Sequence, residues 1–225
     1  LIKEKIPGKK TVCMPNSIDF QLWGDPEIPN RKRKIHIGWI GGANHDDDLK
    51  LIEKPIKKVL DKYKNVEFHC IHGVPNFLKD HPKIKYEIKF YPMTNNRQIK
   101  KAVTYPQKLK EYRWDIAIAP LVDNEFNRAK SNLRYLEYSA AGVPTVASNV
   151  EPFSETITNG ENGFLAETEN DWEDQLSYLI EKKEERLRIR ENAVKFVREK
   201  FDVLSVSENY YDFLSDTVRN HGQKS

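Results

Sequence analysis

Short apolar runs alternate with longer stretches of helical periodicity along most of this sequence. The apolar runs predict strands at 11–14, 35–40, 66–71, 84–90, 115–120 and 145–148. Helical patterns occupy 47–63, 95–112, 131–141, 170–182, 184–200 and 206–219. Strands that alternate with helices indicate βαβ units, and short apolar strands indicate a parallel sheet with both faces covered. The sequence therefore predicts an α/β fold, a doubly wound parallel sheet followed by C-terminal helices.

Prolines and glycines set the expected breaks in this pattern. Pro55 falls inside the first helical stretch, where it predicts a kink or a break, and Tyr105-Pro106 interrupts the second. Gly142 follows the third stretch and is the expected end of that helix. Residues 20–34 combine prolines, a glycine and a basic run, which is typical of a linker.

The ligand-binding edge of such a sheet can be located before any motif is considered. Ligands of open parallel sheets bind beyond the carboxyl ends of the strands. The loops expected at that edge are 38–46, 72–76, 91–97, 121–133 and 149–155. We therefore expect the functional residues to come from these loops and from the helix starts that follow them.

Composition and charge exclude several classes of protein. Hydrophobic residues make up 38% of the 225 residues, and no stretch approaches the roughly 20 apolar residues that a transmembrane helix needs. The net charge of +3 is a weak bias, and the basic run at 31–34 is interpreted as a solvated linker, with no nucleic-acid partner. Cys13 and Cys70 lack metal or CxxC spacing, so reduced thiols in a cytoplasmic chain are expected.

The first candidate binding element is the glycine turn GWIGG at 38–42. Gly41 and Gly42 let backbone N–H groups approach an anion closely, and the positive end of the next helix adds to this attraction. The turn lacks both GxGxxG spacing and a P-loop lysine, so a purely structural turn is an equal alternative. His45 is a candidate phosphate contact in the same loop, whereas the acidic run at 46–48 is expected to serve the helix start rather than a metal.

The second candidate element is the loop and helix at 124–137. Arg128 and Lys130 bring positive charge to the start of the helix, where it disfavours the helix unless an anion compensates it. Ser131 and Asn132 offer hydroxyl, amide and free backbone N–H groups at the same place. These features together favour a phosphate site at the helix start.

A carboxylate further along the same helix extends this candidate site. Arg134 lies four residues after Lys130, and Glu137 lies seven after it, so all three are expected on one helix face. A carboxylate such as Glu137 can accept hydrogen bonds from two vicinal hydroxyls. An ordinary surface helix with Lys–Glu pairing is the alternative. The glycine turns at 159–163 are interpreted as structural.

Together these residues resemble a known family. The run AKSNLRYLEYSAAGVPTVAS at 129–148, followed by NGENGFL at 159–165, is similar to the C-terminal, nucleotide-sugar-binding domain of retaining GT-B glycosyltransferases. VCMPNSID at 12–19 resembles the junction after that family's N-terminal domain, and DIAIAPL at 115–121 resembles the strand before its donor loop. The resemblance implies a Rossmann-like half of a GT-B fold, with a junction and linker over 1–34, a nucleotide-sugar-binding domain over 35–205, and a crossover helix and tail over 206–225.

The resemblance also implies roles for individual residues. In the family, two glutamates with E-x7-E spacing flank the donor sugar; Glu137 matches the second, assigned to the ribose hydroxyls, and Ala129 stands in place of the first. Lys130-Ser131-Asn132 replaces a glycine–phenylalanine–glycine segment, a variation similar to that of bacterial surface-polysaccharide enzymes. The implied catalytic residues are Glu137 and Lys130, and the implied donor-binding residues are Gly41, Gly42, His45, Met93, Thr94, Asn127, Arg128, Ser131, Asn132, Leu133 and Arg134.

The function implied by the resemblance is transfer of a sugar from a nucleoside-diphosphate sugar to a glycan or lipid-linked acceptor. The expected partners are the nucleotide sugar, the acceptor, and an N-terminal acceptor domain of the same enzyme, preceding this sequence. No metal or other cofactor is implied, and the histidines show no zinc spacing, with His69 expected to pack within a strand. The isolated domain is expected to be cytoplasmic, brought to the inner face of the membrane by the missing domain, and to bind nucleotide with little turnover.

A function from a different class stays open. Ala129, in place of the first glutamate, favours a degenerate GT-B-like module that binds or scaffolds without catalysis. Activity of the full-length protein, or an intact nucleotide pocket, would decide against that alternative. A dehydrogenase or epimerase is a weaker interpretation, because the GxGxxG fingerprint and its ribose-binding acid are missing.

Overall fold

A six-stranded sheet forms the centre of the structure, a computed structural model that describes residues 12, 14–26, 34–42, 45–87 and 105–222. Every neighbouring pair of strands is parallel, in the order β3-β2-β1-β4-β5-β6. The strands are β1 (Ile35–Gly41), β2 (Val66–His72), β3 (Ile84–Glu87), β4 (Ile116–Ala119), β5 (Thr145–Ser148) and β6 (Phe164–Ala166). This order is that of a doubly wound sheet whose winding reverses between β1 and β4, so the predicted Rossmann-like α/β fold is confirmed.

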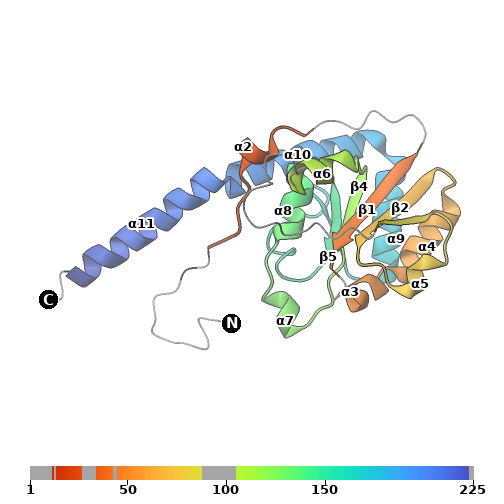
Figure 1. Cartoon of the computed structure of the whole chain (residues 1–225), viewed down its shortest axis with the longest axis horizontal. Coiled ribbons are helices and arrows are strands. Elements are labelled where there is room, and N and C mark those ends of the chain that lie inside the picture. The colour runs from red at the N-terminus through yellow and green to blue at the C-terminus, as the bar shows by residue number, and fades with distance from the viewer. Residues whose placement is uncertain (1–11, 13, 27–33, 43–44, 88–104, 223–225) are drawn as a thin grey trace, which may run out of the picture.

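Helices cover both faces of this sheet (Figure 1). They are α2 (Phe20–Trp23), α3 (Asp46–Lys50), α4 (Glu53–Lys62), α5 (Asn76–Lys79), α6 (Tyr105–Glu111), α7 (Glu125–Arg128), α8 (Leu133–Ala140), α9 (Glu169–Glu181), α10 (Lys183–Phe201) and α11 (Val203–Gly222). Apolar residues of α4 and α9 pack on one face, and those of α2, α6 and α8 pack on the other. Helix α11 extends away from the sheet, and none of the described helices combines the length and apolar character needed to cross a bilayer.

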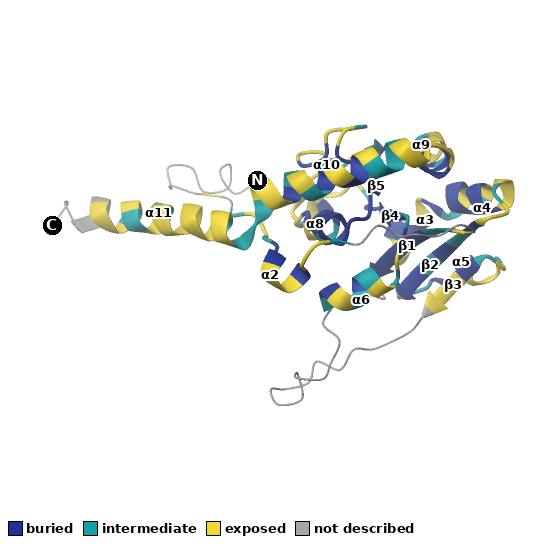
Figure 2. Cartoon of the chain, turned by 90° about the horizontal axis from the view of Figure 1, so that it is seen from above, coloured by how far each residue is buried: buried dark blue, intermediate teal, exposed yellow. Residues whose placement is uncertain are grey.

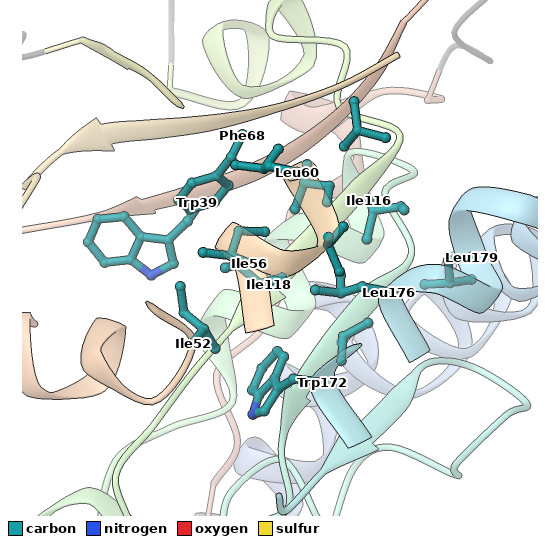
Figure 3. Packing of buried hydrophobic residues seen from close by; sticks show 14 of the residues in the cluster. Trp39, Ile52, Ile56, Leu60, Phe68, Ile116, Ile118, Trp172, Leu176 and Leu179 are labelled. Atoms are coloured by element: carbon teal, nitrogen blue, oxygen red, sulfur yellow. The ribbon is translucent and has the colours of Figure 1, made fainter. Parts of the chain in front are cut away.

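Alternate residues of the central strands point to opposite faces and so divide the core in two. From β1, Ile37 and Trp39 join Leu60 of α4 and Trp172 of α9 in the first core, and Figure 3 shows several of these side chains together. Ile40 belongs to the second core instead. Figure 2 shows that the central strands are buried along most of their length, as expected for a parallel sheet covered on both sides.

A hydrogen bond joins helix α8 to the end of β1. The pairing of β1 with β4 covers only Ile37 with Ile116 and Gly38 with Ala117. Beyond that point the Ile40 N–H donates a hydrogen bond of 3.1 Å to the hydroxyl of Tyr138, a fully buried residue of α8. The tyrosine therefore satisfies a strand N–H that the sheet does not, and it fixes α8 relative to the loop after β1.

The segment at Ile18 lies beside the junction of α10 and α11. The Ile18 N–H donates to the Phe201 carbonyl at 2.7 Å, and the Val203 N–H donates to the Ile18 carbonyl at 3.0 Å. Ile18 thereby forms an isolated parallel bridge with Asp202, at the junction of α10 and α11. Arg190 of α10 adds a second link, because its guanidinium donates to the Pro26 carbonyl at 3.0 Å.

The structure confirms the breaks expected near Pro55 and at Gly142. The stretch at 47–63 is split into α3 and α4, and Pro55 lies in the first turn of α4, where its missing N–H removes no helical hydrogen bond. The helix expected at 131–141 ends as predicted. Gly142 has φ +73° and follows the C-cap Ala141, which is the left-handed position that glycine favours after a helix.

Other expectations were wrong or incomplete. Val12 and Met14, the described residues of the strand predicted at 11–14, lie outside any strand, and the supposed linker at 20–34 contains α2. The sequence also missed α5, α7 and β6, because a helix of four residues makes only about one turn and shows no helical periodicity, and β6 has only three residues. The last helix begins at Val203 rather than 206. Residues 88–104 lie outside the described part of the chain, so the donor-binding roles predicted for Met93 and Thr94 fall on residues that the structure does not describe.

Substitution of Gly38 tests the packing of β1 against Trp114. A Cβ at Gly38 would lie 1.8 Å from Cδ2 of Trp114, whose side chain is itself buried, so the ring has no room to move. We expect Gly38→Ala to lower the free energy of unfolding by at least about 2 kcal/mol. Chemical denaturation of both proteins measures the difference. Gly42→Ala is the matched control and should change stability little, since nothing lies within 4 Å of a Cβ there.

Candidate functional site

The glycine loop after β1 lies at the point where the winding of the sheet reverses. A Cβ at Gly41 would lie 2.5 Å from the ring of Trp39 and 2.9 Å from Nη2 of Arg134. Gly41 is therefore required by packing, because it lets the guanidinium of Arg134 reach the loop from α8. Gly42 is exposed, with open space where its side chain would be, so its backbone is accessible to a ligand.

His45 is held in this loop by a carboxylate. Its Nδ1 lies 2.7 Å from Oδ2 of Asp48, one turn into α3, and its Nε2 lies 3.5 Å from Nη2 of Arg134. The ring also packs edge-on against Trp39, with centroids 5.9 Å apart. The Asp48 contact fixes the orientation of the imidazole and turns its second nitrogen toward Arg134.

Asp48 itself is a buried connection between three segments. Besides His45, its carboxylate accepts the Val122 N–H at 2.8 Å and lies 3.4 Å from Nδ2 of Asn127. Burial acts to raise the pKa of Asp48, but the hydrogen bonds from His45 and Val122 and the charge of Lys130 outweigh it and leave the pKa below its ordinary value. As predicted from the acidic run, Asp48 lies in the first turn of α3, and its carboxylate in addition joins the loops after β1 and β4.

Arg134 brings a positive charge to the glycine loop. Its guanidinium lies 5.4 Å from the ring centroid of Trp39, a cation–π arrangement, and beside His45 as described. Within the described residues it has no carboxylate at ion-pair distance. The same is true of Lys130, whose ammonium lies 5.0 Å from the ring of Phe126. In the part of the chain that the structure describes, two cations that lack a carboxylate at ion-pair distance favour an anionic ligand.

The start of α8 differs from the sequence-based expectation. The helix begins at Leu133, so Lys130 lies in the preceding turn and does not share a helical face with Arg134 and Glu137. Asn132 is the N-cap residue but makes no side-chain cap; its Nδ2 donates to Oγ1 of Thr156 at 3.0 Å. The first N–H groups of α8 thus lack a side-chain cap and remain suited to an anion. Ser131 and Leu133 are exposed at this end.

The side chains of Asn127 and Arg128 make hydrogen bonds within the protein. Asn127 is buried, and its amide donates to the Val122 carbonyl at 2.8 Å. Arg128 is exposed and makes a bidentate ion pair with Asp123, with nitrogen–oxygen distances of 2.6 and 2.8 Å. In this structure both residues shape the loop before α8, and neither side chain is directed to the glycine loop by a contact.

Glu137 lies one turn after Arg134 and is paired with a tyrosine. The Tyr105 hydroxyl, from the start of α6, donates to Oε2 of Glu137 at 3.0 Å. Burial raises the pKa of Glu137 to about 7, against the opposing effects of this hydrogen bond and of Arg134. Burial and the neighbouring Glu137 also raise the pKa of Tyr105, so the tyrosine stays a donor. No sequence pattern indicates this partner, because 32 positions separate the two residues.

The described site therefore unites part of the predicted set. Gly41, Gly42, His45 and Arg134 meet at the loop after β1, and Glu137 follows Arg134 on α8. Sequence reasoning missed Trp39, Asp48 and Tyr105, which orient these residues. The arrangement can hold an anion beside a carboxylate that is ready to accept hydrogen bonds.

Comparison with known protein families now identifies the chain. A profile described as glycosyl transferases group 1 matches residues 70–196, more than half of the sequence. The chain belongs to this family. The matched range includes β4, the α7–α8 segment and β5, so the resemblance seen in the sequence is confirmed. A comparison with curated proteins gave no match.

Solved structures of other proteins share this fold. A mutant of S. aureus TarM, crystallised with fondaparinux, alpha-GlcNAc-glycerol and UDP, superimposes with a TM-score of 0.69 at 17% identity, over 94% of this chain and 41% of that one. Anabaena HepE, with UDP and glucose, gives 0.64 at 14%, over 89% and 55%. The C-terminal domain of LpcC from Francisella tularensis gives 0.58 at 22%, over 83% and 99%. The chain thus spans only part of TarM and HepE but nearly all of the LpcC domain.

The raised pKa of Glu137 makes a prediction about stability. A carboxyl with a pKa near 4.5 when unfolded and about 7 when folded binds protons more tightly in the folded state. Its ionisation therefore costs stability as pH rises from the unfolded to the folded pKa, by at most ~3 kcal/mol. We expect Glu137→Gln to unfold like the wild type below about pH 4 and to be the more stable protein above about pH 8.

Denaturant titrations of both proteins across this pH range provide the measurement. Glu53→Gln is a control of opposite sign, because hydrogen bonds from Lys50 and Lys57 lower the pKa of Glu53 despite partial burial. A stability difference between wild type and Glu137→Gln that does not change with pH would contradict the assignment.

Proposed function

We propose that this chain is the donor-binding domain of a glycosyltransferase that moves a sugar from a nucleoside-diphosphate sugar to a glycan or lipid-linked acceptor. The observation that carries the proposal is the spacing of Arg134 and Glu137. The two residues lie one turn apart on α8. Arg134 contacts the glycine loop, and the carboxylate of Glu137 follows Arg134 on the helix. A nucleoside diphosphate carries phosphates and vicinal ribose hydroxyls at a comparable separation, so both groups find a partner on one ligand.

The diphosphate is placed between the glycine loop and the start of α8. Arg134 and Lys130 supply positive charge, and the uncapped N–H groups of α8 supply hydrogen bonds. His45, oriented by Asp48, presents its second ring nitrogen beside Arg134 in the same loop. During transfer the leaving diphosphate gains negative charge, and these groups are already in position to stabilise it. In this proposal the protein's own cations do this work, without a metal ion.

In this proposal, Glu137 binds the ribose of the nucleotide. An ionised carboxylate accepts hydrogen bonds from both vicinal hydroxyls, while the Tyr105 hydroxyl holds one of its oxygens in place. Because the pKa of Glu137 is about 7, ligand binding at neutral pH must draw the carboxyl into its ionised form. The presence of UDP in the TarM structure, and of UDP and glucose in the HepE structure, supports uridine nucleotides as the first ligands to test.

The wider activity rests on the same proposal. The chain covers 41% of TarM and 55% of HepE, so the acceptor site is assigned to a domain outside this sequence, and retention of configuration at the sugar is part of the proposal. The isolated domain is then expected to bind donor with little transfer. Polysaccharide synthesis at the cytoplasmic face of a membrane is the setting that this acceptor class favours.

One observation favours a second function. Ala129, where the family's first glutamate would stand, is the exposed C-cap residue of α7, so that position offers no carboxylate. A module that binds nucleotide sugar without transferring it fits this substitution. Transfer activity of a full-length protein that contains this domain decides between the two functions.

The binding role can be tested by isothermal titration with UDP, GDP and their sugars. We expect saturable binding of at least one of them, and a loss of at least ~10-fold in affinity for Arg134→Gln, because a charge-assisted contact to phosphate is worth about 1.5–3 kcal/mol. Lys58→Gln removes one positive charge at an ion pair with Glu173, away from the glycine loop, and should bind like the wild type. Absence of binding by any of these nucleotides at millimolar concentration would overturn the proposal.

The ribose role makes a separate prediction about pH. UDP-glucose is the suitable probe if uridine nucleotides bind, since its diphosphate does not titrate near neutrality. Affinity should rise as pH increases through about 7, because the ionised Glu137 is the better acceptor for hydroxyls. In Glu137→Gln this rise should disappear. If affinity still rises in the variant, another group is responsible and the ribose assignment fails, even where nucleotide binding itself is retained.

A further inference from the structure

Two histidines and a glutamate from distant parts of the sequence meet on one face of the sheet. The register of β1 and β2 pairs His36 with Glu67 and Gly38 with His69. Because Glu67 and His69 are two residues apart on one strand, they and His36 project on the same side. One potential ligand atom from each of the three residues lies within 4.8 Å of the other two.

The distances between these atoms suit a single metal ion. Nε2 of His36 lies 3.7 Å from Oε2 of Glu67, and Nε2 of His69 lies 4.0 Å from the same oxygen. Zinc binds imidazole nitrogen and carboxylate oxygen at about 2.0–2.2 Å, which places tetrahedral ligands roughly 3.3 Å apart. Small side-chain movements are enough to close the remaining gaps.

We propose that His36, Glu67 and His69 bind a divalent transition-metal ion of the zinc class. Nitrogen and carboxylate ligands in this combination favour zinc and its neighbours over magnesium or calcium, which prefer oxygen ligands. Three protein ligands leave a fourth position for water. The sequence did not indicate the site, because the two histidines lie on different strands and have no zinc spacing.

The surroundings of the cluster are compatible with such an ion. The three side chains are largely shielded from solvent, with exposed fractions of 12%, 16% and 18%. Lys34 lies 2.5 Å from Oε1 of Glu67, so Oε2 is the oxygen that faces the histidines. Lys34 has a 54% exposed side chain and can turn to solvent when a cation binds. The carboxylate of Asp115 accepts a hydrogen bond of 2.9 Å from the backbone N–H of His36 and adds negative charge nearby.

Both histidines have other contacts, so the ion must compete with them. We therefore infer a site that is weaker than four-ligand structural zinc sites. It lies at the start of β1 and β2, whereas Gly41 and His72 mark the opposite ends of the same strands, where the donor is proposed to bind. The ion would join β1 to β2 and stabilise the sheet, without a part in sugar transfer.

Titration of the metal-free wild-type chain, without an affinity tag, tests the site with Zn²⁺ alone. We expect saturable binding of one ion per chain and a rise in melting temperature on adding Zn²⁺, since an ion that binds the folded state stabilises it. Glu67→Gln and His69→Gln should each lower the Zn²⁺ affinity at least ~10-fold and abolish the rise in melting temperature. Glu67→Gln keeps the size of the side chain and an oxygen for Lys34, so it is the variant with the smaller risk of misfolding.

His81→Gln is the matched control. His81 lies 3.3 Å from Asp61, so it is also a histidine beside a carboxylate, but it is not part of the cluster. It should leave Zn²⁺ binding unchanged. NMR shifts of the imidazole nitrogens of His36 and His69 in the wild-type chain provide a readout that needs no substitution, and both should move on adding Zn²⁺. Lack of saturable binding, or binding that survives both Glu67→Gln and His69→Gln, would overturn the proposal.

Discussion

The close approach of α8 to the end of β1 is the constraint on which the rest of the site depends. Where β1 and β4 separate, the buried hydroxyl of Tyr138 takes over the strand N–H of Ile40. One turn earlier, Arg134 packs on Gly41, where any larger residue would force it away. Because tyrosine and arginine are both anchored to the same strand, the groups on α8 keep a fixed position relative to the glycine loop.

Charge is distributed unevenly around this contact. The negative charge of Asp48 is buried and satisfied by hydrogen bonds, and it holds the imidazole of His45. In the described part of the chain, neither Arg134 nor Lys130 has an acidic partner at ion-pair distance. Glu137 has a pKa of about 7, so it neutralises them only in part at physiological pH. Among the described residues, these two cations are thus not fully neutralised, which is a costly arrangement unless a ligand completes it.

Sequence patterns were sufficient for the fold but only partly for the site. Apolar runs such as IHIGWI, buried on both faces, located five of the six strands, and Gly142 located the end of α8, because both signals are local. Strand β6 has three residues after a glycine turn and carries too little pattern to be recognised. The partners of the site residues depend on tertiary structure: Tyr105 reaches Glu137, and Asp48 reaches Val122, across many positions. For the same reason, spacing alone placed Lys130 on the helix face of Arg134, whereas the helix starts after it.

The bridge between Ile18 and Asp202 has a mechanical consequence. The segment that enters the domain and the helix that leaves it are hydrogen-bonded to one another at a single point. Ile18 donates to Phe201, the last residue of α10, and accepts from Val203, the first residue of α11. A rotation of α11 about this junction must therefore carry the segment at Ile18 with it or break the hydrogen bond from Val203, while the bond to Phe201 holds that segment to α10. The entering segment and the leaving helix cannot move independently of one another without losing a backbone hydrogen bond.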